Sequence, residues 1–511
     1  MSAASPMTAP KVLRLDRQDA VAVAIAEIAE GEVLGDGLAA RCAVPAGHKL
    51  AVRHIARGEV IRKFGVAIGE ASQDIAAGEH VHSHNLVFRP AEATEGFKIL
   101  LPNPAPGGSN RTFEGYVRAD GRVGTRNLLM VMATVNCSAT VARAIAARFS
   151  REIEGHEPPN FDGVVAIAHD HGCSVRADGP GMANLRRTLG GYANHPNVAG
   201  ALVVGLGCED NQVDAFLAAS GLIRSEGLSA LVIQERGGTA ATIAAGVEAL
   251  RQMLPLATAA RRTTVPAARL TVGLQCGGSD GFSALTANPA LGRAVDRLVA
   301  AGGGAILSET PELYGAERLL LDRVASSDVA ARLQAKLEWW RRQSQRDGGS
   351  LDNNPSAGNH AGGITTILEK SLGAVAKAGR TPLNGVYDYA QRIDRPGLVF
   401  MDSPGYDPVS ATGQVAAGAN LVCFTTGRGS CFGCKPAPSL KLATNTAMFR
   451  RMAGDMDLNC GEIADGTASL DEMGERIFEL MLATASGRRT ASETLGYGDE
   501  EFVPWVPGLT Y

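Results

Sequence analysis

RLTVGLQCGGSDGFSALTANPALG (residues 269–292) joins an apolar run to a polar, glycine-rich turn. The run RLTVGL is typical of a buried strand, and Cys276, two glycines, Ser279 and Asp280 follow it closely. The glycines let the backbone approach a ligand and expose N–H groups to it. Parallel sheets bind ligands beyond the carboxyl ends of their strands. This turn is therefore either a structural loop or part of a binding site, with Cys276 facing a metal or a substrate.

The same order of apolar run, polar tip and helical segment recurs along most of the chain. NLLMVMATV leads into Asn136 and Cys137, GVVAIA leads into HDHGC, and the pattern restarts near residue 268. Short continuous apolar strands that alternate with helices predict parallel sheets. We therefore expect an α/β protein with two α/β domains, residues 113–264 and 265–511. The polar residues that follow strand-like runs are Cys137, His169, Asp170, His171, Cys173, Cys208, Glu209, Cys276, Asp280, Glu309, Asp402 and Arg428.

The N-terminal part of the chain has a different pattern. Residues 12–90 contain short alternating strands separated by glycines, which predicts a small β-rich domain. Residues 91–112 are rich in Pro, Gly and Asn, which is typical of a linker. The first 20 residues lack an apolar signal core, so we interpret them as a short leader.

Composition limits the classes of partner. A length of 511 residues predicts about two to four domains. The net charge is −4, and Lys and Arg form no block, which argues against a nucleic acid partner. Charges or glycines interrupt every apolar stretch before about 18 residues, so we expect no membrane span. The nine cysteines of an unsecreted chain are expected to be reduced, with some available as metal ligands.

The segment HVHSHN places His80, His82 and His84 at every second position. On a strand the three side chains would share one face. Neutral imidazoles on one face can bind a divalent metal or act as acid and base. The alternative is an edge strand with incidental histidines.

Two strand tips in the first predicted α/β domain carry thiols. HDHGCS offers His169 and Cys173 as site residues, with a capped turn as the alternative. GLGCED offers Cys208 and Glu209 as ligands, although a small buried thiol is the commoner fate of a cysteine.

Two further motifs occur near residue 430. Cys431 and Cys434 form a single C-x-x-C pair, which favours a turn lined with small residues over a zinc site. TTGRGS could bind a carboxylate through its backbone N–H groups, with Arg428 adding a bidentate contact. It is neither a P-loop nor a dinucleotide fingerprint.

Long motifs in a fixed order give the chain a family resemblance. They are GEHVHSHN, GYVRADGRVGTRN, HGCS, VVGLGCEDNQ, QCGGSDGFSALTANPALG, NPSAGNHAGGITTILEKSLGAVAKAG and FTTGRGS with KLATNT. On these motifs the chain resembles the altronate dehydratase / galactarate dehydratase family of sugar-acid hydro-lyases. The resemblance implies an N-terminal SAF-type domain, a second domain and a Rossmann-like C-terminal domain. It also implies a cytoplasmic enzyme of sugar-acid catabolism that depends on a divalent metal, iron in the first place, then manganese or magnesium.

Within that family, HVHSHN is nearer the altronate branch. His360 stands where a Lys is common, and GRGSCFGCKPAPS also departs from the pattern of the two named activities. Both departures bear on the substrate more than on the reaction class. We expect dehydration of an altronate-like aldonate to a 2-keto-3-deoxy acid. The alternatives are a galactarate or other aldarate dehydratase, a sulfo-lyase for a sulfonated hydroxy acid, and a sugar-acid-binding protein without catalysis.

Dehydration of this kind needs a base for the α-proton, an acid for the leaving hydroxyl and stabilisation of the developing charge. The acid/base candidates are His82, His84 and His169. The metal-ligand candidates are Cys173, Cys208, Glu209 and Cys276, with an iron–sulfur cluster held by several cysteines as the alternative. The candidates for binding the substrate are Arg118, Arg126, Ser279, Asp280, Asn288 and Arg428. We expect a homodimer that acts on a small sugar acid.

Overall fold

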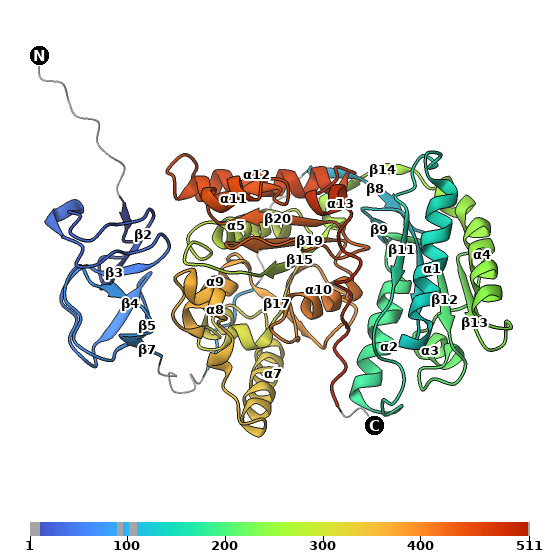
Figure 1. The fold of residues 1–511 in the computed structure, drawn as a ribbon, viewed down its shortest axis with the longest axis horizontal. Helices are drawn as coiled ribbons and strands as arrows, with labels where there is room; N and C mark the ends of the chain where they lie inside the picture. Colours follow the sequence, from blue (N-terminus) through green and yellow to red (C-terminus); the bar gives the residue numbers. More distant parts are fainter. Residues whose placement is uncertain (1–10, 89–95, 102–109, 509–511) are drawn as a thin grey trace, which may run out of the picture.

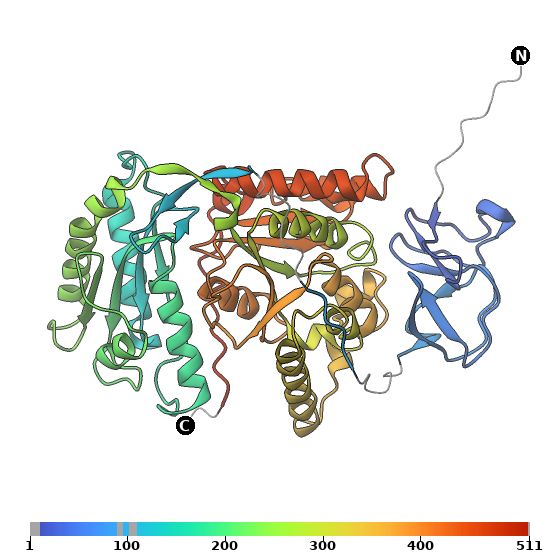
Figure 2. The ribbon, with the colours of Figure 1, turned by 180° about the vertical axis from the view of Figure 1, so that it is seen from behind.

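The computed structural model of the protein describes residues 11–88, 96–101 and 110–508. Three units follow one another along the chain, and the third lies between the other two (Figures 1 and 2). We call them the N-terminal, middle and C-terminal units. Most of the predicted linker lies outside the described residues. No helix in the described ranges is both long enough and apolar enough to cross a bilayer.

The N-terminal unit contains two antiparallel sheets, with strand orders β1-β2-β3-β6 and β4-β5-β7. Ile55, Ile61 and Ile75 are fully buried in its core, between turns that glycines close. The predicted β-rich domain is confirmed. Its strands are β1 (Val12–Leu13), β2 (Val21–Ala24), β3 (Lys49–Ala51), β4 (Val60–Lys63), β5 (Val66–Ala71), β6 (His80–Val81) and β7 (Leu86–Val87), with a 3₁₀ turn at Gly35–Gly37.

The middle unit is built on a parallel sheet of order β11-β10-β12-β13. Its strands are β10 (Leu128–Ala133), β11 (Val164–Ile167), β12 (Val198–Gly205) and β13 (Leu228–Val232). All six residues of β10 are buried, because helices cover both faces of the sheet. The helices are α1 (Asn136–Ile153), α2 (Pro180–Ala193), α3 (Val213–Ala219) and α4 (Thr239–Ala259).

A small antiparallel sheet joins the middle unit to the C-terminal unit. It has the order β14-β8-β9, formed by β8 (Thr112–Val117), β9 (Val123–Gly124) and β14 (Arg262–Pro266). The N–H of Glu114 in β8 donates to the Ser486 hydroxyl, which follows the last long helix of the chain. The predicted boundary after residue 264 therefore falls inside β14.

The C-terminal unit has a seven-stranded sheet in which every pairing is parallel. Its strands are β15 (Thr271–Cys276), β16 (Gly304–Leu307), β17 (Leu383–Tyr387), β18 (Gly397–Met401), β19 (Leu421–Thr426), β20 (Ser439–Ala443) and β21 (Leu458–Asn459). Its α-helices are α5 (Ala287–Ala300), α6 (Arg318–Leu321), α7 (Ser327–Arg346), α8 (Ala357–Ala361), α9 (Ile367–Ala376), α10 (Asp407–Ala416), α11 (Thr446–Arg451), α12 (Leu470–Ala485) and α13 (Ala491–Leu495). Short 3₁₀ turns are η2 (Ala267–Arg269), η3 (Thr310–Leu313), η4 (Leu351–Asn353) and η5 (Cys460–Ile463).

The strand order β17-β18-β16-β15-β19-β20-β21 reverses its direction between β15 and β19. Such a switch point is where open α/β sheets bind ligands. The prediction of an α/β protein with parallel sheets is confirmed. The Rossmann-like description stays a prediction, because β17 lies outside β18 and the order differs from the 3-2-1-4-5-6 arrangement.

The N-terminal unit packs against the turn that follows β15. A Cβ added to Gly281 would lie 1.9 Å from the backbone oxygen of Gly47, so only glycine permits this approach. Lys49 and Lys63 of the N-terminal unit are buried, and both pair with Glu369 on α9. These contacts hold the N-terminal unit beside the carboxyl ends of the C-terminal strands.

Candidate active site

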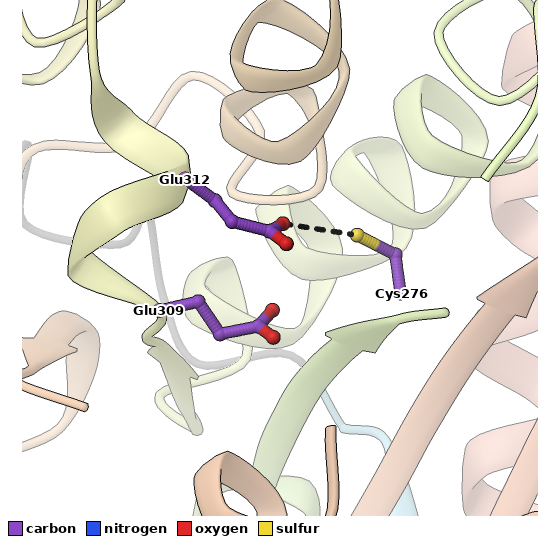
Figure 3. A group of neighbouring side chains, drawn as sticks. All are labelled: Cys276, Glu309 and Glu312. Atoms are coloured by element: carbon purple, nitrogen blue, oxygen red, sulfur yellow. Dashed lines mark hydrogen bonds between the residues drawn. The ribbon is translucent and has the colours of Figure 1, made fainter. Parts of the chain in front are cut away.

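A buried group of two carboxylates and a thiol lies where β15 and β16 end. Cys276 is the last residue of β15, Glu309 follows β16, and Glu312 lies in η3. Figure 3 shows the three side chains pointing toward one another. Their ligand atoms all lie within 4.8 Å of one another, and Cys276 Sγ is 3.8 Å from Glu312 Oε2. Among the described residues, no other three His, Cys, Asp or Glu side chains gather this closely.

Two lysines, the buried Lys377 and the partly buried Lys370, close this group from the side of α9. Lys377 Nζ donates to Cys276 Sγ at 3.0 Å and lies 3.7 Å from Glu309 Oε2. Lys370 Nζ lies 2.8 Å from Glu312 Oε1. The ammonium groups compensate much of the negative charge that the buried acids would otherwise carry alone.

Asp407, the first residue of α10, completes the group. A Cβ added to Gly277 would lie 2.0 Å from Asp407 Oδ2, so glycine lets this carboxylate reach the end of β15. We call Cys276, Glu309, Glu312, Lys370, Lys377 and Asp407 the carboxylate–thiol cluster.

The backbone at Glu309 is held in an unusual conformation. Its φ is 71°, in the left-handed region that non-glycine residues rarely adopt. Its N–H donates to the Ser403 hydroxyl, and the N–H of Thr310 donates to the Ser403 carbonyl. The Thr310 hydroxyl also donates to Asp402 at the end of β18. Strain of this kind is concentrated at functional sites, and here it aims a carboxylate into the cluster.

Burial is the first cause of the raised pKa values of three acidic groups in the carboxylate–thiol cluster. Burial raises the pKa of the Cys276 thiol to about 12, although Lys377 opposes this shift. Burial, and then repulsion from Glu312, raises the pKa of Glu309 well above its usual range. The same two causes raise the pKa of Asp407 to about 7. The pKa of Lys377 is raised because the surrounding thiol and carboxylates outweigh its burial. The cluster therefore holds protons that can move near neutral pH.

The donor set of this group fits a divalent metal. Both carboxylate oxygens of Glu309 are buried, and no hydrogen-bond donor reaches them within the described part of the chain. Buried carboxylates normally have such partners. One thiol and two carboxylates supply both sulfur and oxygen ligands. Such a set suits ferrous or manganous ions better than magnesium, which prefers oxygen ligands. Cys276, Glu309 and Glu312 are the residues that could hold the ion.

The predicted histidine strand is wrong in its geometry. Strand β6 ends at Val81, because the N–H of His82 donates to Asn85 Oδ1 and the chain turns. His82 and His84 therefore lie on a turn and not on one strand face. The rings still gather: the centroids of His80 and His82 lie 5.4 Å apart, and those of His80 and His84 lie 5.6 Å apart.

Two histidines that the motif did not predict join this group. His48 Nδ1 lies 3.0 Å from His80 Nε2, and the His360 ring centroid lies 6.1 Å from that of His82. We call His48, His80, His82, His84 and His360 the histidine group. His48 Nε2 lies 3.2 Å from the Ala361 carbonyl oxygen, and His82 Nε2 lies 3.0 Å from that of His360. These contacts bridge the N-terminal and C-terminal units.

Burial keeps the rings of His80 and His82 neutral. It lowers the pKa of His80 to about 3 and that of His82 to about 4, and nearby cationic groups add to both shifts. A neutral ring can donate its N–H to a carbonyl oxygen, as the contacts of His48 and His82 require. The rings are not members of the carboxylate–thiol cluster.

Two of the arginines predicted to bind substrate have structural partners instead. Arg118 donates to the Pro196 carbonyl and to Asn127 Oδ1. Arg126 forms a bidentate pair with Glu493, at 2.6 and 2.8 Å. These bonds use the guanidinium groups to join distant segments of the chain.

Ser279, Asp280 and Asn288 are buried around a small cavity that Lys370 also lines. Asp280 accepts hydrogen bonds from Ser283 and Thr444, and Asn288 donates to the Gly373 carbonyl. These residues shape the turn after β15. Arg428 differs from them, because its side chain is exposed where β19 ends.

The four predicted metal ligands do not form one site. Cys276 belongs to the C-terminal unit, and Cys173, Cys208 and Glu209 belong to the middle unit. Glu209 accepts hydrogen bonds from the Thr134 hydroxyl and from the N–H of Leu206, so its carboxylate closes the turn after β12. Cys276 therefore lies apart from the other three candidates, and a role for those three in metal binding stays a prediction.

His169 also lies in the middle unit, buried, with Nε2 3.1 Å from the Ala133 carbonyl oxygen. Burial lowers its pKa to about 4. It holds the tip of β11 against β10 and has no place in the carboxylate–thiol cluster.

Four members of the cluster were missed by the sequence-based selection: Glu312, Lys370, Lys377 and Asp407. A signal for the two lysines was present. Lys370 and Lys377 stand seven residues apart in the otherwise largely apolar segment ILEKSLGAVAKAG, which places them on one face of a helix.

Comparison with known proteins assigns a family to all three units. Family models match in chain order as the altronate/galactarate dehydratase SAF domain, the D-galactarate dehydratase/altronate hydrolase second domain and the D-galactarate/altronate dehydratase C-terminal domain. They cover residues 10–89, 115–258 and 267–510 respectively.

Individual relatives cover most of the chain. The altronate dehydratase of Escherichia coli (strain K12) is 37% identical over 489 residues, 94% of this chain and 96% of the relative. The galactarate dehydratase (L-threo-forming) of the same strain is 35% identical, over 89% of this chain and 88% of the relative. The (2R)-sulfolactate sulfo-lyase subunit beta of Chromohalobacter salexigens is 34% identical, over 77% of this chain and 97% of the relative. With three matching domains and such coverage, the chain belongs to the altronate/galactarate dehydratase family of hydro-lyases.

Proposed function

We propose that the protein dehydrates an altronate-like sugar acid to a 2-keto-3-deoxy acid at the carboxylate–thiol cluster. The observation that carries the proposal is the buried group of Cys276, Glu309 and Glu312, closed by Lys377 beside a switch point of the sheet. Relatives named altronate dehydratase and galactarate dehydratase support the reaction class.

The reaction begins with loss of the proton beside the carboxylate. That proton is weakly acidic, because the carboxylate resists a second negative charge. Glu309 is the base: no hydrogen-bond donor reaches its oxygens, and the burial that raises its pKa makes its ionised carboxylate a stronger base. Asp407, with a pKa of about 7, is the acid that protonates the leaving hydroxyl. Lys370 and Lys377 offset the charge that develops on the substrate.

A divalent ion, with iron favoured over manganese and magnesium, would be held by Cys276, Glu309 and Glu312. When bound, it would act as a Lewis acid toward the substrate carboxylate. Cys276 would then give up the proton that burial retains, since the thiolate is the form that binds metals. Glu309 would hold the ion through one carboxylate oxygen and could serve as base through the other.

Arg428 is the residue that would bind the substrate carboxylate. It is exposed beyond β19, at the same edge of the sheet as Cys276, and a guanidinium binds carboxylates in bidentate fashion. Two members of the histidine group, His82 and His84, were predicted as acid and base. In this proposal the histidine group instead holds the N-terminal unit beside this edge of the sheet.

Two other reactions share the first step. A galactarate or other aldarate dehydratase would differ only in the second carboxylate of its substrate. A sulfo-lyase would expel sulfite in place of water, and a relative bears the name (2R)-sulfolactate sulfo-lyase subunit beta. A sugar-acid-binding protein without catalysis is disfavoured, since binding alone needs no buried carboxylate without a hydrogen-bond donor, such as Glu309.

An anaerobic substrate screen tests the proposal. Altronate, galactarate and sulfolactate are supplied with ferrous, manganous or magnesium ions, and 2-keto-3-deoxy acid and sulfite are measured. We expect the keto acid from altronate. Cys276→Ser should lower its formation by at least about 100-fold, whereas the control Cys423→Ser, a buried thiol outside the cluster, should not. No keto acid from any sugar acid, or full activity of folded Cys276→Ser, would refute the proposal.

A further inference from the structure

Three exposed cysteines lie at one edge of the middle unit, far along the chain from Cys276. Cys137, Cys173 and Cys208 follow β10, β11 and β12 respectively. All nine cysteines of the chain are described, and Cys431 is the one other exposed cysteine among them. Free cysteines are usually buried, so three exposed thiols on one edge call for a reason.

The strand order brings these three tips together. Strand β10 lies between β11 and β12, and all pairings are parallel. Ala133 of β10 is paired with Val204 of β12, and Cys137 and Cys208 each lie four residues further on. Neighbouring strands are about 4.8 Å apart, so the three tips start within about 10 Å of one another.

Backbone contacts hold the tips against one another. The N–H of Asn136 donates to the His171 carbonyl at 2.9 Å, and the N–H of Asn211 donates to the Gly172 carbonyl at 3.0 Å. A Cβ added to Gly172 would lie 2.4 Å from the Thr134 carbonyl oxygen. Cys173, the next residue, is thereby fixed over the end of β10.

The loop that carries Cys208 is equally well held. The buried Glu209 side chain bonds to the Thr134 hydroxyl of the neighbouring tip at 2.9 Å. Gln234, beyond β13, donates to Cys208 Sγ at 3.4 Å. Cys137 is the second residue of α1, an 18-residue helix, so it stands in the first turn, where backbone N–H groups lack partners within the helix.

Two kinds of metal site differ in how closely their ligand atoms approach one another. Ligands of a single ion would converge within 4.8 Å, and in the described residues such convergence occurs only around Cys276. In a four-iron cluster each cysteine sulfur binds a different iron, so the sulfurs stand farther apart. Three exposed thiols on three adjacent tips match the second arrangement.

We propose that Cys137, Cys173 and Cys208 bind three irons of a [4Fe–4S] cluster, separate from the carboxylate–thiol cluster. Each thiol loses its proton to solvent and forms one sulfur–iron bond, without transfer of electrons. The fourth iron has no cysteine ligand and stays open to water or a small anion at the solvent-exposed edge. This site does not depend on the proposed dehydration.

Iron and sulfide analysis of the full chain tests this site. After anaerobic incubation with equal amounts of ferrous and ferric iron and with sulfide, followed by desalting, the wild type should retain about four sulfides and about four irons per chain beyond the ion of the carboxylate–thiol cluster. Dithionite should give it the electron paramagnetic resonance signal of a reduced four-iron cluster. Cys137→Ser, Cys173→Ser and Cys208→Ser should each lose most of the iron, the sulfide and the signal. Cys431→Ser, the exposed control, should keep all three.

Alkylation of the wild type gives a readout that does not depend on how the variants fold. Iodoacetamide should label Cys431 but spare Cys137, Cys173 and Cys208 in the cluster-loaded protein, and chelation should expose all four. Zinc or iron without sulfide, or equal labelling of the four thiols in the loaded protein, would overturn the proposal. Glu309→Gln should abolish dehydration while the sulfide and the four cluster irons stay complete, so failure of one proposal is distinguishable from failure of the other.

Discussion

Lys377 Nζ lies 3.0 Å from Cys276 Sγ, and both side chains are buried where the sheet of the C-terminal unit ends. Lys377→Met removes the cation and leaves Glu309 and Glu312 less compensated. We expect a loss of about 3–5 kcal/mol in the free energy of unfolding, as for other broken buried pairs. Keto-acid formation should fall by at least about 100-fold. Urea unfolding and steady-state rates measure the two effects.

Lys98→Met is the matched control. Lys98 pairs with Asp322 at the surface, where an ion pair contributes at most about 1 kcal/mol. If Lys377→Met were as stable and as active as Lys98→Met, Lys377 would have no part in the cluster.

Glu369 is predicted to hold the N-terminal unit in place. Its carboxylate pairs with both Lys49 and Lys63, whose side chains are 0% and 2% exposed. Glu369→Gln leaves two buried cations with one neutral partner, and should cost about 3–5 kcal/mol. Limited proteolysis should then separate the N-terminal unit from the rest faster than in wild type. Glu59→Gln, which breaks an exposed pair with Arg53, should leave the cleavage rate unchanged.

The histidine group predicts that acid weakens the contact between the N-terminal and C-terminal units. The folded pKa values of His80 and His82, about 3 and about 4, lie below the unfolded value of about 6.5. The unfolded chain therefore binds more protons over this range, and stability present above about pH 6.5 is lost as pH falls toward 4. Unfolding free energies of wild type and His82→Asn across this range should show a flatter curve for the variant.

His54→Gln, at an exposed position of the same unit, should follow the wild-type curve. A His82→Asn curve as steep as that of wild type would show that the ring does not titrate with folding.

Variants of Arg126 and Arg428 distinguish an arginine with a structural role from one that binds the substrate. Arg126→Gln breaks the bidentate pair with Glu493 and should lower stability by about 3 kcal/mol, with KM unchanged in the folded fraction. Arg428→Gln should raise KM about tenfold or more with little change in the thermal midpoint, since its side chain is exposed. A raised KM for Arg126→Gln, with an unchanged KM for Arg428→Gln, would instead indicate that Arg126 binds the substrate.

The parallel sheets could be predicted from sequence because buried strands carry continuous apolar runs. Residues 128–133 read LLMVMA, and the structure buries every one of them. Cys276 could be predicted as a site residue for a related reason, since it follows such a run directly. Position at a strand end is a local property that the sequence displays.

Glu312, Lys370 and Asp407 could not be selected in the same way. They come from segments after β16, before β17 and after β18, and they meet only because the strand order interleaves these segments. The prediction of a histidine strand failed for a local reason, because Asn85 turns the chain after Val81 and ends the strand. His48 joins the group through β3, which pairs with β6, a pairing that no short motif displays.

The rate of dehydration by Glu309→Gln tests most directly whether the carboxylate–thiol cluster is the active site. The amide keeps the shape of the side chain, and the relief of repulsion from Glu312 offsets the loss of the contact with Lys377, so the thermal midpoint should change little. Without its base, the enzyme should form keto acid at least about 100-fold more slowly. Glu317→Gln, which alters a carboxylate paired with Arg341 outside the cluster, should keep the wild-type rate. A folded Glu309→Gln protein that dehydrates sugar acid as fast as Glu317→Gln would contradict the assignment.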